Sequence, residues 1–309
     1  MGRQKANTAN GLAVAAVLTA AILWGTTGTA QAMLGGAVDP IWIGALRMLL
    51  GAATLWSLCL VVGRSDLRLA HVRSCWLAIL CAGIAIGSYN LFFFEAVLRA
   101  GVGVGTMLTI GSAPIWATLI QSALGNRPTL PALFGQAMCI AGASFLVIGS
   151  DTGTVEPMGV LLALLSGLGY AIYSLFTSRA AQTVGPLPLA AASFTVAATL
   201  TTPFVAITTA PPALGTTTIA IVLFLGVIAT GFAYAIYTFG LRTVQPSTAI
   251  TLVLAEPLSA WLLAIVVVGE AASAPQMLGA VVLLTGLWIV IRVSRSTAAP
   301  RLQSAGATA

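Results

Sequence analysis

The chain has 309 residues, of which 59% are hydrophobic and only 6% are charged. A water-soluble domain carries about 25% charged residues, so this chain has too little polar surface to cover a water-exposed globule. Its 13 basic and 7 acidic residues leave a net charge of +6, a balance that elsewhere suggests a nucleic-acid partner. The composition therefore excludes a soluble domain and indicates a chain that lies mostly in lipid.

Ten apolar segments, each long enough to cross a bilayer as a helix, follow one another along the chain. A spanning helix needs about 20 apolar residues, whereas a barrel strand shows alternating segments of about 10 residues. The segments are 12–33, 40–62, 75–97, 102–124, 131–149, 157–178, 187–207, 217–239, 246–268 and 275–292. Helix-breaking pairs such as Arg127-Pro128 and Pro211-Pro212 mark the short joins between them. The sequence predicts an all-α integral membrane protein of ten transmembrane helices.

The basic residues predict the orientation of these helices. Lysine and arginine concentrate in cytoplasmic loops, and a cytoplasmic N-terminus places nearly all of them on that side. The inside residues are then Arg3, Lys5, Arg64, Arg68, Arg73, Arg127, Arg179, Arg242, Arg292, Arg295 and Arg301. The outside residues are Arg99 and the acids Asp39, Asp151, Glu156 and Glu270. We therefore expect both ends in the cytoplasm, with tails 1–11 and 293–309, and no basic patch left for nucleic acid.

An internal repeat relates the two halves of the chain, because residues 98–119 align with residues 241–262 at an offset of 143 residues. The matches are Leu98-Arg99 with Leu241-Arg242, Ala113-Pro114 with Glu256-Pro257 and, after one inserted residue, Gly135 with Gly279 and Gly142 with Gly286. The chain then consists of two five-helix halves, 12–149 and 157–292. Because five is odd, the second half enters the bilayer from the opposite side, and the repeat is inverted. Secondary transporters build alternating access on such repeats, around a site near the midplane.

The first segment also imitates a secretory signal. Arg3 and Lys5 precede an apolar stretch, and Ala30-Gln31-Ala32 looks like a cleavage site. The apolar stretch is longer than a usual signal core, however, and the repeat requires this helix. We therefore expect residues 12–33 to be retained.

Residue types that carry out catalysis or bind metals are scarce. Cys59, Cys75, Cys81 and Cys139 lie within or at the ends of apolar segments, and no Cys-x-x-Cys pairs with a histidine. The only histidine, His71, lies in a loop that carries several arginines. No G-x-S-x-G, H-E-x-x-H or phosphate-binding loop is present. We expect packing cysteines, no metal, no cofactor and no enzymatic activity.

Short motifs follow one another in a fixed order over residues 12–292. They are Trp24-Gly25, Ala45-Leu46-Arg47, Ala113-Pro114, Leu241-Arg242, Ala255-Glu256-Pro257 and Gly269-Glu270. In these motifs the chain resembles the drug/metabolite transporter superfamily, in its ten-helix form with two EamA-type repeats. The resemblance implies a bacterial inner-membrane carrier, commonly an exporter of amino acids or other small metabolites. The chain is similar to the amino-acid exporter branch of this superfamily. The chain departs from the pattern at Gly125-Asn126, where a Gly-Glu pair often ends the fourth helix, so no role is assigned to Asn126.

Polar and aromatic side chains within the segments are candidates for a substrate path. All five tyrosines lie in the segments, and a tyrosine hydroxyl that faces lipid would lack a partner. By the resemblance, the helices that carry them surround a central cavity. The predicted substrate-binding residues are Trp24, Tyr89, Asn90, Tyr170, Tyr173 and Tyr234. The alternative is a belt of aromatic residues at the membrane surface, which suits Trp42, Trp76 and Trp288 at segment ends.

Two charged residues lie deep inside the segments. A charge at the bilayer centre costs roughly 2.5–3.5 kcal/mol on insertion scales, so we expect Glu256 and Arg47 to face the interior. Glu256 either serves as a proton-coupling or substrate-amine site, or satisfies carbonyls that Pro257 leaves free. Arg47 either contacts a substrate carboxylate or extends outward to pair with a loop acid. Glu95 and Arg99 are four residues apart, in the order that favours a helical ion pair.

These observations lead to one principal function and several alternatives. We expect a secondary-active exporter of amino acids or similar small neutral metabolites, acting as a monomer in the bacterial inner membrane by alternating access. An organic-phosphate or nucleotide-sugar exchanger is disfavoured, because its anionic substrates would need several basic residues in the segments and only Arg47 is available. A membrane-embedded enzyme would need clustered nucleophiles, bases or metal ligands, and a structural protein would not need an inverted repeat.

The predicted topology can be tested with reporter fusions. A cytoplasmic reporter should be active when fused after Arg68 or Arg179, and a periplasmic reporter when fused after Thr152 or Ala272. Reporter activity in cells measures the side of the membrane directly. A periplasmic signal after Arg179 would contradict the five-plus-five inversion.

Overall fold

The computed structural model describes residues 2–36, 38–62, 73–147, 155–212, 215–269 and 271–305, and the regular structure in these residues is helical. Ten helices in this part of the chain are long and apolar enough to cross a membrane, which confirms the predicted ten spans. Arg64, Arg68, His71, Asp151 and Glu270, which entered the sequence predictions, lie outside the described residues.

Eight of the spans are single α-helices, and two are divided. The single helices are α1 (Gly2–Ala32), α2 (Pro40–Val61), α4 (Trp76–Ala100), α5 (Val102–Ala123), α6 (Leu130–Val147), α7 (Pro157–Ala180), α8 (Pro186–Thr208) and α13 (Ala274–Ala305). The eighth span consists of α9 (Thr216–Leu223), the π-helix η1 (Phe224–Phe232) and α10 (Ala233–Gly240). The ninth consists of α11 (Pro246–Val253), α12 (Ala255–Leu263) and the π-helix η2 (Ala264–Val268). Both divided spans differ from the unbroken helices that the sequence predicts.

Local sequence signals explain where several helices begin. Proline occupies the first turn of α2, α7, α8 and α11, where its missing N–H costs nothing and its fixed φ suits the helix. The Asp39 side chain also accepts a hydrogen bond of 2.9 Å from the backbone N–H of Ile41, which caps α2. Gly101, with φ of 82°, forms the whole join between α4 and α5, a backbone conformation that favours glycine.

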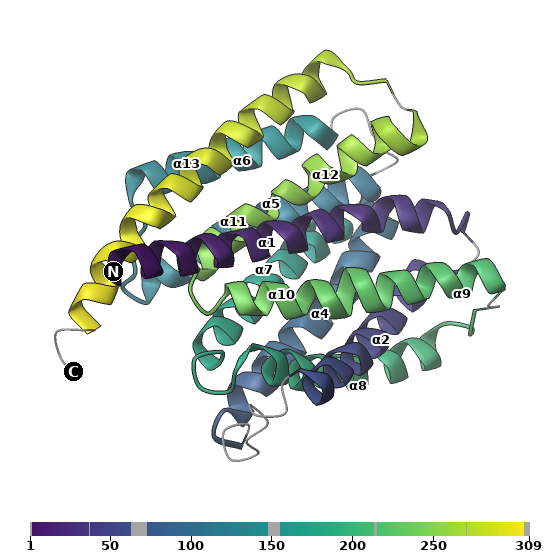
Figure 1. Ribbon diagram of the computed structural model, residues 1–309. Coiled ribbons are helices and arrows are strands. Elements are labelled where there is room, and N and C mark those ends of the chain that lie inside the picture. The colour runs from purple at the N-terminus through teal and green to yellow at the C-terminus, as the bar shows by residue number, and fades with distance from the viewer. Residues whose placement is uncertain are drawn as a thin grey trace.

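The helices run side by side, and α1 begins at the same end of the bundle at which α13 ends (Figure 1). We call this the terminal end and the opposite one the far end. Because the spans alternate in direction, α7 and α10 end at the terminal end, whereas α2 and α5 begin at the far end. The positive-inside prediction makes the terminal end cytoplasmic.

The contacts between helices come in equivalent pairs when the last five spans are matched in order to the first five. The third span, α4, packs on α7 and α8, and its counterpart, the eighth span, packs on α1 and α2. Likewise α5 packs on α7, and α12 packs on α1. The pairs α2–α8 and α6–α13 each join a helix to its own counterpart. Two halves related by a two-fold axis would produce this pattern.

The four glycines of the repeat alignment meet one another where α6 packs on α13, the pair along one side of the bundle in Figure 1. A Cβ on Gly286 would lie 2.8 Å from the Gly135 carbonyl oxygen, and a Cβ on Gly279 would lie 2.7 Å from the Gly142 carbonyl oxygen. Gly135 is aligned with Gly279, and Gly286 with Gly142, so the two contacts are equivalent in the repeat alignment. Small residues allow transmembrane helices to approach this closely. Cys139 is buried in the same interface, as expected for a packing cysteine.

The ion pair predicted between Glu95 and Arg99 is present at the far end. Arg99 Nε lies 3.1 Å from Glu95 Oε2, which confirms the predicted helical pair. The same guanidinium also reaches Glu156, with 3.4 Å between the charged atoms, and so links the end of α4 to the start of α7. Both pairs are exposed to solvent, so each contributes little to stability.

The three tryptophans assigned to a surface belt differ from one another. Trp76 and Trp288 are exposed, as belt residues would be. Trp42 is buried in a cluster with Leu34 and Val38, because the turn after α1 folds back over the start of α2. Its position near a helix end therefore did not predict its surroundings.

Candidate functional site

A cavity lies inside the bundle, lined by seven of the ten spans and by none of α6, α8 and α13. The space free of protein atoms in the cavity, together with the open space at its mouth, is about 720 Å³. Arg47 and Thr109 line it about two turns from the far end, and Glu256 lies halfway along the ninth span. The polar part of the cavity is thus close to mid-depth.

The structure brings most of the predicted site residues to this one cavity. Trp24, Arg47, Tyr89, Asn90, Tyr170, Tyr234 and Glu256 all line it. Tyr173, which was also predicted to bind substrate, does not line the cavity. Its side chain is fully buried, and its hydroxyl lies 3.4 Å from that of Thr238. The three-residue spacing from Tyr170 turns Tyr173 into the packed interior between α7, α8 and α10.

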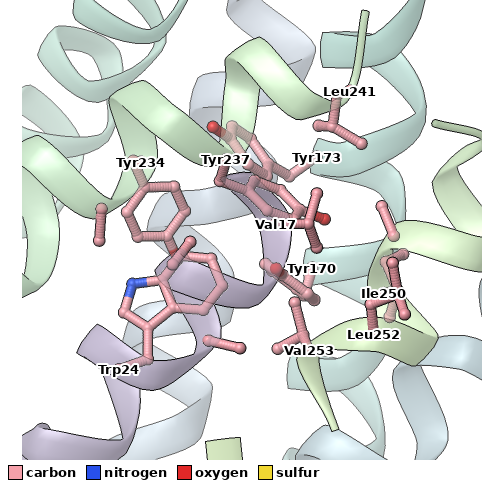
Figure 2. Close-up of a cluster of buried hydrophobic side chains, with 14 of the residues drawn as sticks. Val17, Trp24, Tyr170, Tyr173, Tyr234, Tyr237, Leu241, Ile250, Leu252 and Val253 are labelled. Carbon is pink, nitrogen blue, oxygen red and sulfur yellow. The ribbon is translucent and has the colours of Figure 1, made fainter. Parts of the chain in front are cut away.

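Six aromatic side chains form a continuous cluster next to the cavity, five of which appear in Figure 2. The aromatic cluster consists of Trp24, Tyr170, Tyr173, Phe194, Tyr234 and Tyr237. Ring centroids are 4.8 Å apart for Trp24 and Tyr234, and 4.6 Å apart for Phe194 and Tyr234. The Tyr237 hydroxyl forms a 2.9 Å hydrogen bond with the Ser174 hydroxyl. Such contacts, at 4.5–7 Å in tilted or edge-on geometry, stabilise packing beyond simple burial.

The aromatic cluster separates the cavity from a second hollow at the terminal end. Along α7, Tyr170 lines the cavity, Tyr173 is packed in the cluster, and Ser178 lines the hollow. The eighth span repeats this order: Tyr234 lines the cavity and Tyr237 is packed in the cluster, with Leu241 just beyond α10 lining the hollow. The cluster therefore closes the cavity toward the terminal end.

Arg47 faces the interior of the bundle. Its Nε–H donates a 3.0 Å hydrogen bond to the Thr230 hydroxyl, and its side chain lines the cavity. Among the described residues, no carboxylate oxygen lies within 4.0 Å of its guanidinium nitrogens. The observed position of Arg47 therefore does not correspond to the alternative in which its side chain extends outward to pair with a loop acid. The guanidinium is a cation in the wall of a cavity, without an anionic partner among these residues.

Glu256 follows the break in the ninth span, where α11 ends at Val253 and α12 begins at Ala255. Its carboxyl group lines the cavity and accepts no hydrogen bond from an N–H or O–H of the described residues. The hydroxyl of Ser259 donates a 2.8 Å hydrogen bond to the Glu256 backbone carbonyl, a local bond that serine commonly forms within a helix. The cavity thus holds one acid and one base on separate walls.

Several lining residues were not anticipated. They are Thr27, Met48, Phe93, Phe94, Thr109, Ile110, Ile250 and Val253. Phe93 and Phe94 could have been found, because they lie one turn beyond Tyr89 and Asn90 on the same helix faces. The aliphatic residues carry no such signal, since apolar side chains face lipid and cavity alike in a membrane helix.

Known proteins are similar to this chain in sequence and in fold. The model of the EamA-like transporter family matches residues 11–148 and again residues 157–292. The uncharacterized transporter YwfM of Bacillus subtilis is 36% identical over 294 residues, which cover 93% of this chain and 94% of that protein. The threonine/homoserine exporter RhtA of Escherichia coli is 26% identical over 76% of each chain. The uncharacterized inner membrane transporter YicL of Salmonella typhimurium is 24% identical over 91% of this chain and 96% of its own.

A solved crystal structure has the same fold, with a TM-score of 0.79 at 22% sequence identity, over 92% of this chain and 98% of that chain. The chain is thus a multi-pass protein of the inner membrane, and its relatives are transporters rather than enzymes. Two matches of one family model, which together span nearly the whole chain, show that it belongs to the EamA-like transporter family.

Proposed function

We propose that this protein is a secondary carrier that exports amino acids or similar small neutral metabolites by alternating access. The observation that supports this most directly is the mid-depth cavity, whose walls combine aromatic rings, an amide, hydroxyl groups and one charge of each sign. A site of this kind suits a small zwitterion with an apolar side chain, which carries both charges and buries apolar surface. The name of the relative RhtA, an exporter of threonine and homoserine, points to the same class.

Polyanionic substrates fit this cavity poorly. Arg47 is the only basic residue in its lining, and a phosphate or sugar nucleotide brings at least two negative charges into a low-dielectric site. Uncompensated charge there is costly. Glu256 in the same lining would repel such a substrate further. An organic-phosphate or nucleotide-sugar exchanger is therefore the weaker candidate.

The proposed transport cycle exchanges the roles of two five-helix repeats, 12–149 and 157–292. The two matches of the family model and the paired helix contacts support this division. With both chain ends in the cytoplasm, the aromatic cluster closes the cavity on the cytoplasmic side. Loading from the cytoplasm then requires this cluster to separate, while helices at the far end close over the substrate. The cycle can be driven by proton antiport or by the substrate gradient alone.

Counterflow in proteoliposomes tests the function. Vesicles that contain the purified protein and a high concentration of unlabelled amino acid should accumulate the labelled form transiently and saturably. We expect this for neutral amino acids, including threonine, homoserine and aromatic ones, and not for a sugar nucleotide or a sugar phosphate. Protein-free vesicles give the background. Counterflow of a sugar nucleotide without any response to amino acids would overturn the proposal.

The structure predicts different effects for two tyrosines. Tyr89→Ala removes a ring from the cavity wall and should raise the half-saturation concentration about threefold or more, with little change in Tm. Tyr173→Ala leaves a hole in the aromatic cluster and should destabilise the protein by about 3–5 kcal/mol. Counterflow and thermal unfolding in detergent measure the two effects. Tyr173→Phe, which keeps the ring, serves as the control. An unchanged Tm together with weakened binding in Tyr173→Ala would place Tyr173 in the substrate site instead.

Glu256 distinguishes proton coupling from a structural role. Glu256→Gln keeps the shape and hydrogen-bonding capacity of the side chain but cannot release a proton. If Glu256 carries the coupled proton, efflux driven by an imposed pH gradient should collapse in this variant, whereas substrate exchange without net proton movement should persist. If Glu256 only satisfies carbonyls near Pro257, both activities should survive in Glu256→Gln, and Glu256→Leu should misfold.

The two activities are measured in the same vesicles, with and without the pH gradient. Glu95→Gln is a matched control, because Glu95 lies near the far end of α4 in an ion pair with Arg99 and does not line the cavity. Equal efflux by wild type and Glu256→Gln under the gradient would exclude the coupling role.

A further inference from the structure

We propose that Thr230, in the π-helix η1, is a positioning residue that aims the Arg47 guanidinium into the cavity so that Arg47 binds the carboxylate of the substrate. The inference rests on the proposed function, since it assigns one end of the exported amino acid to a particular pair of side chains. It concerns a residue that does not line the cavity and that acts only through Arg47.

The hydrogen bond to Thr230 determines which part of the guanidinium remains available. Arg47 Nε–H points at the Thr230 hydroxyl oxygen, 3.0 Å away. Among the described residues, no acceptor forms a hydrogen bond with either terminal nitrogen of Arg47. The edge formed by these two nitrogens can therefore receive both oxygens of one carboxylate, which is the bidentate geometry that guanidinium groups favour.

The Thr230 hydroxyl is itself oriented by the backbone. It donates its proton to the Leu225 carbonyl oxygen, 2.8 Å away. A hydroxyl has one proton and two lone pairs, so this bond commits the proton and leaves a lone pair for Arg47. Thr230 is completely buried, which restricts it to this arrangement.

Close packing brings Thr230 within reach of Arg47. A Cβ on Gly51 would lie 2.8 Å from Thr230 Cγ2, so α2 can approach η1 here only because residue 51 is glycine. On the other side, Gly226 and Gly231 of η1 pack against Leu50 and Thr54 of α2 in the same way. Residues Phe224–Phe232 form a π-helix. π-Helices are rare in proteins, and those that occur often lie at functional sites.

The charge balance of the cavity favours a carboxylate in a zwitterion over other anions. Arg47 can neutralise one negative charge, and Glu256, on another span of the lining, offers a negative charge for an ammonium group. An α-amino acid satisfies both, whereas its carboxamide lacks the anionic end and an N-acetyl derivative lacks the cationic end. The proposal therefore predicts that Thr230 affects only substrates that carry a carboxylate.

The experiment compares an amino acid with its carboxamide in counterflow. Thr230→Val keeps the shape of the side chain and removes the hydroxyl. It should raise the half-saturation concentration for the amino acid by about tenfold, since hydrogen bonds to charged groups contribute the most, while the maximal rate stays within about twofold. The half-saturation concentration for the carboxamide should change by less than about twofold. Thr230→Ser, which keeps the hydroxyl, should restore wild-type behaviour.

A neighbouring residue provides the matched control. Thr54 lies in the same α2–η1 interface, but its hydroxyl donates only to the Leu50 carbonyl, at 2.8 Å. Thr54→Val should therefore leave the preference for the amino acid over the carboxamide unchanged. In an Arg47→Gln background, which removes the carboxylate contact itself, Thr230→Val should have no additional effect on half-saturation.

Several outcomes would overturn the proposed role of Thr230. An equal rise for amino acid and carboxamide in Thr230→Val, or the same selectivity change in Thr54→Val, would show a general packing effect and overturn the proposal. If Thr230→Val fails to fold, Arg47→Lys gives the answer: lysine keeps the charge but cannot bond Thr230 and also offer two parallel N–H groups. Wild-type affinity for the amino acid in Arg47→Lys would overturn the proposal. Wild-type protein that transports no amino acid would overturn the proposed function and this inference together.

Discussion

The hydrocarbon core of a bilayer offers no hydrogen-bond partners, and this constraint shapes the whole protein. Every backbone N–H and C=O must be satisfied within its own helix, which accounts for the all-helical fold. Polar side chains must either bond to the backbone, as Thr54 does with Leu50, or turn toward one another in the interior. The Ser174–Tyr237 pair does the latter. Some of the buried polar atoms that have no partner in the described part of the chain, those of Trp24, Thr27, Asn90 and Tyr170, belong to side chains that line the cavity near mid-depth.

Charge makes this cavity chemically specific. Arg47 and Glu256 both line it, yet their charged groups are not within ion-pairing distance of each other. Each is costly at this depth, and neither has an ionic partner among the described residues. A substrate that brings one charge of each sign relieves both costs at once, whereas an uncharged or singly charged molecule relieves one at most. The same physical cost that makes charged residues rare in the spans is thus the basis of the proposed preference for zwitterions.

The sequence predicted what depends on hydrophobicity and order along the chain. It predicted ten spans, and its repeat alignment identified four glycines that meet between α6 and α13. It also identified seven residues that line the cavity. Tyr173 lies outside the cavity lining, because a three-residue step places two side chains about 60° apart on a helix, enough for one ring to face the cavity and the other the packed interior.

The role of Thr230 could not have been predicted in this way. Its contact with Arg47, 183 residues away in the chain, depends on a π-helix and on glycines in both helices. Neither the apolar pattern of the eighth span nor the repeat signals a local change from α to π geometry. Such a change arises from tertiary packing. Close approach of two helix backbones and a buried side-chain hydrogen bond compensate for the less favourable backbone hydrogen bonds of a π-helix.

If the protein works by the proposed alternating access, the location of the glycine contacts indicates which of its parts can stay together while the cavity changes sides. The pairs α2–α8 and α6–α13 each join counterparts of the two halves, so an exchange of conformation between the halves maps each pair onto itself. Their contacts, including that of Gly135 with Gly286, can therefore persist through the cycle. The aromatic cluster has no such protection, because its side chains come from α1, α7, α8 and α10, and α1, α7 and α10 pack on helices that are not their counterparts. In the proposed cycle the contacts of Tyr234 and Tyr237 with Trp24 would therefore have to separate, whereas the α2–α8 and α6–α13 contacts would persist.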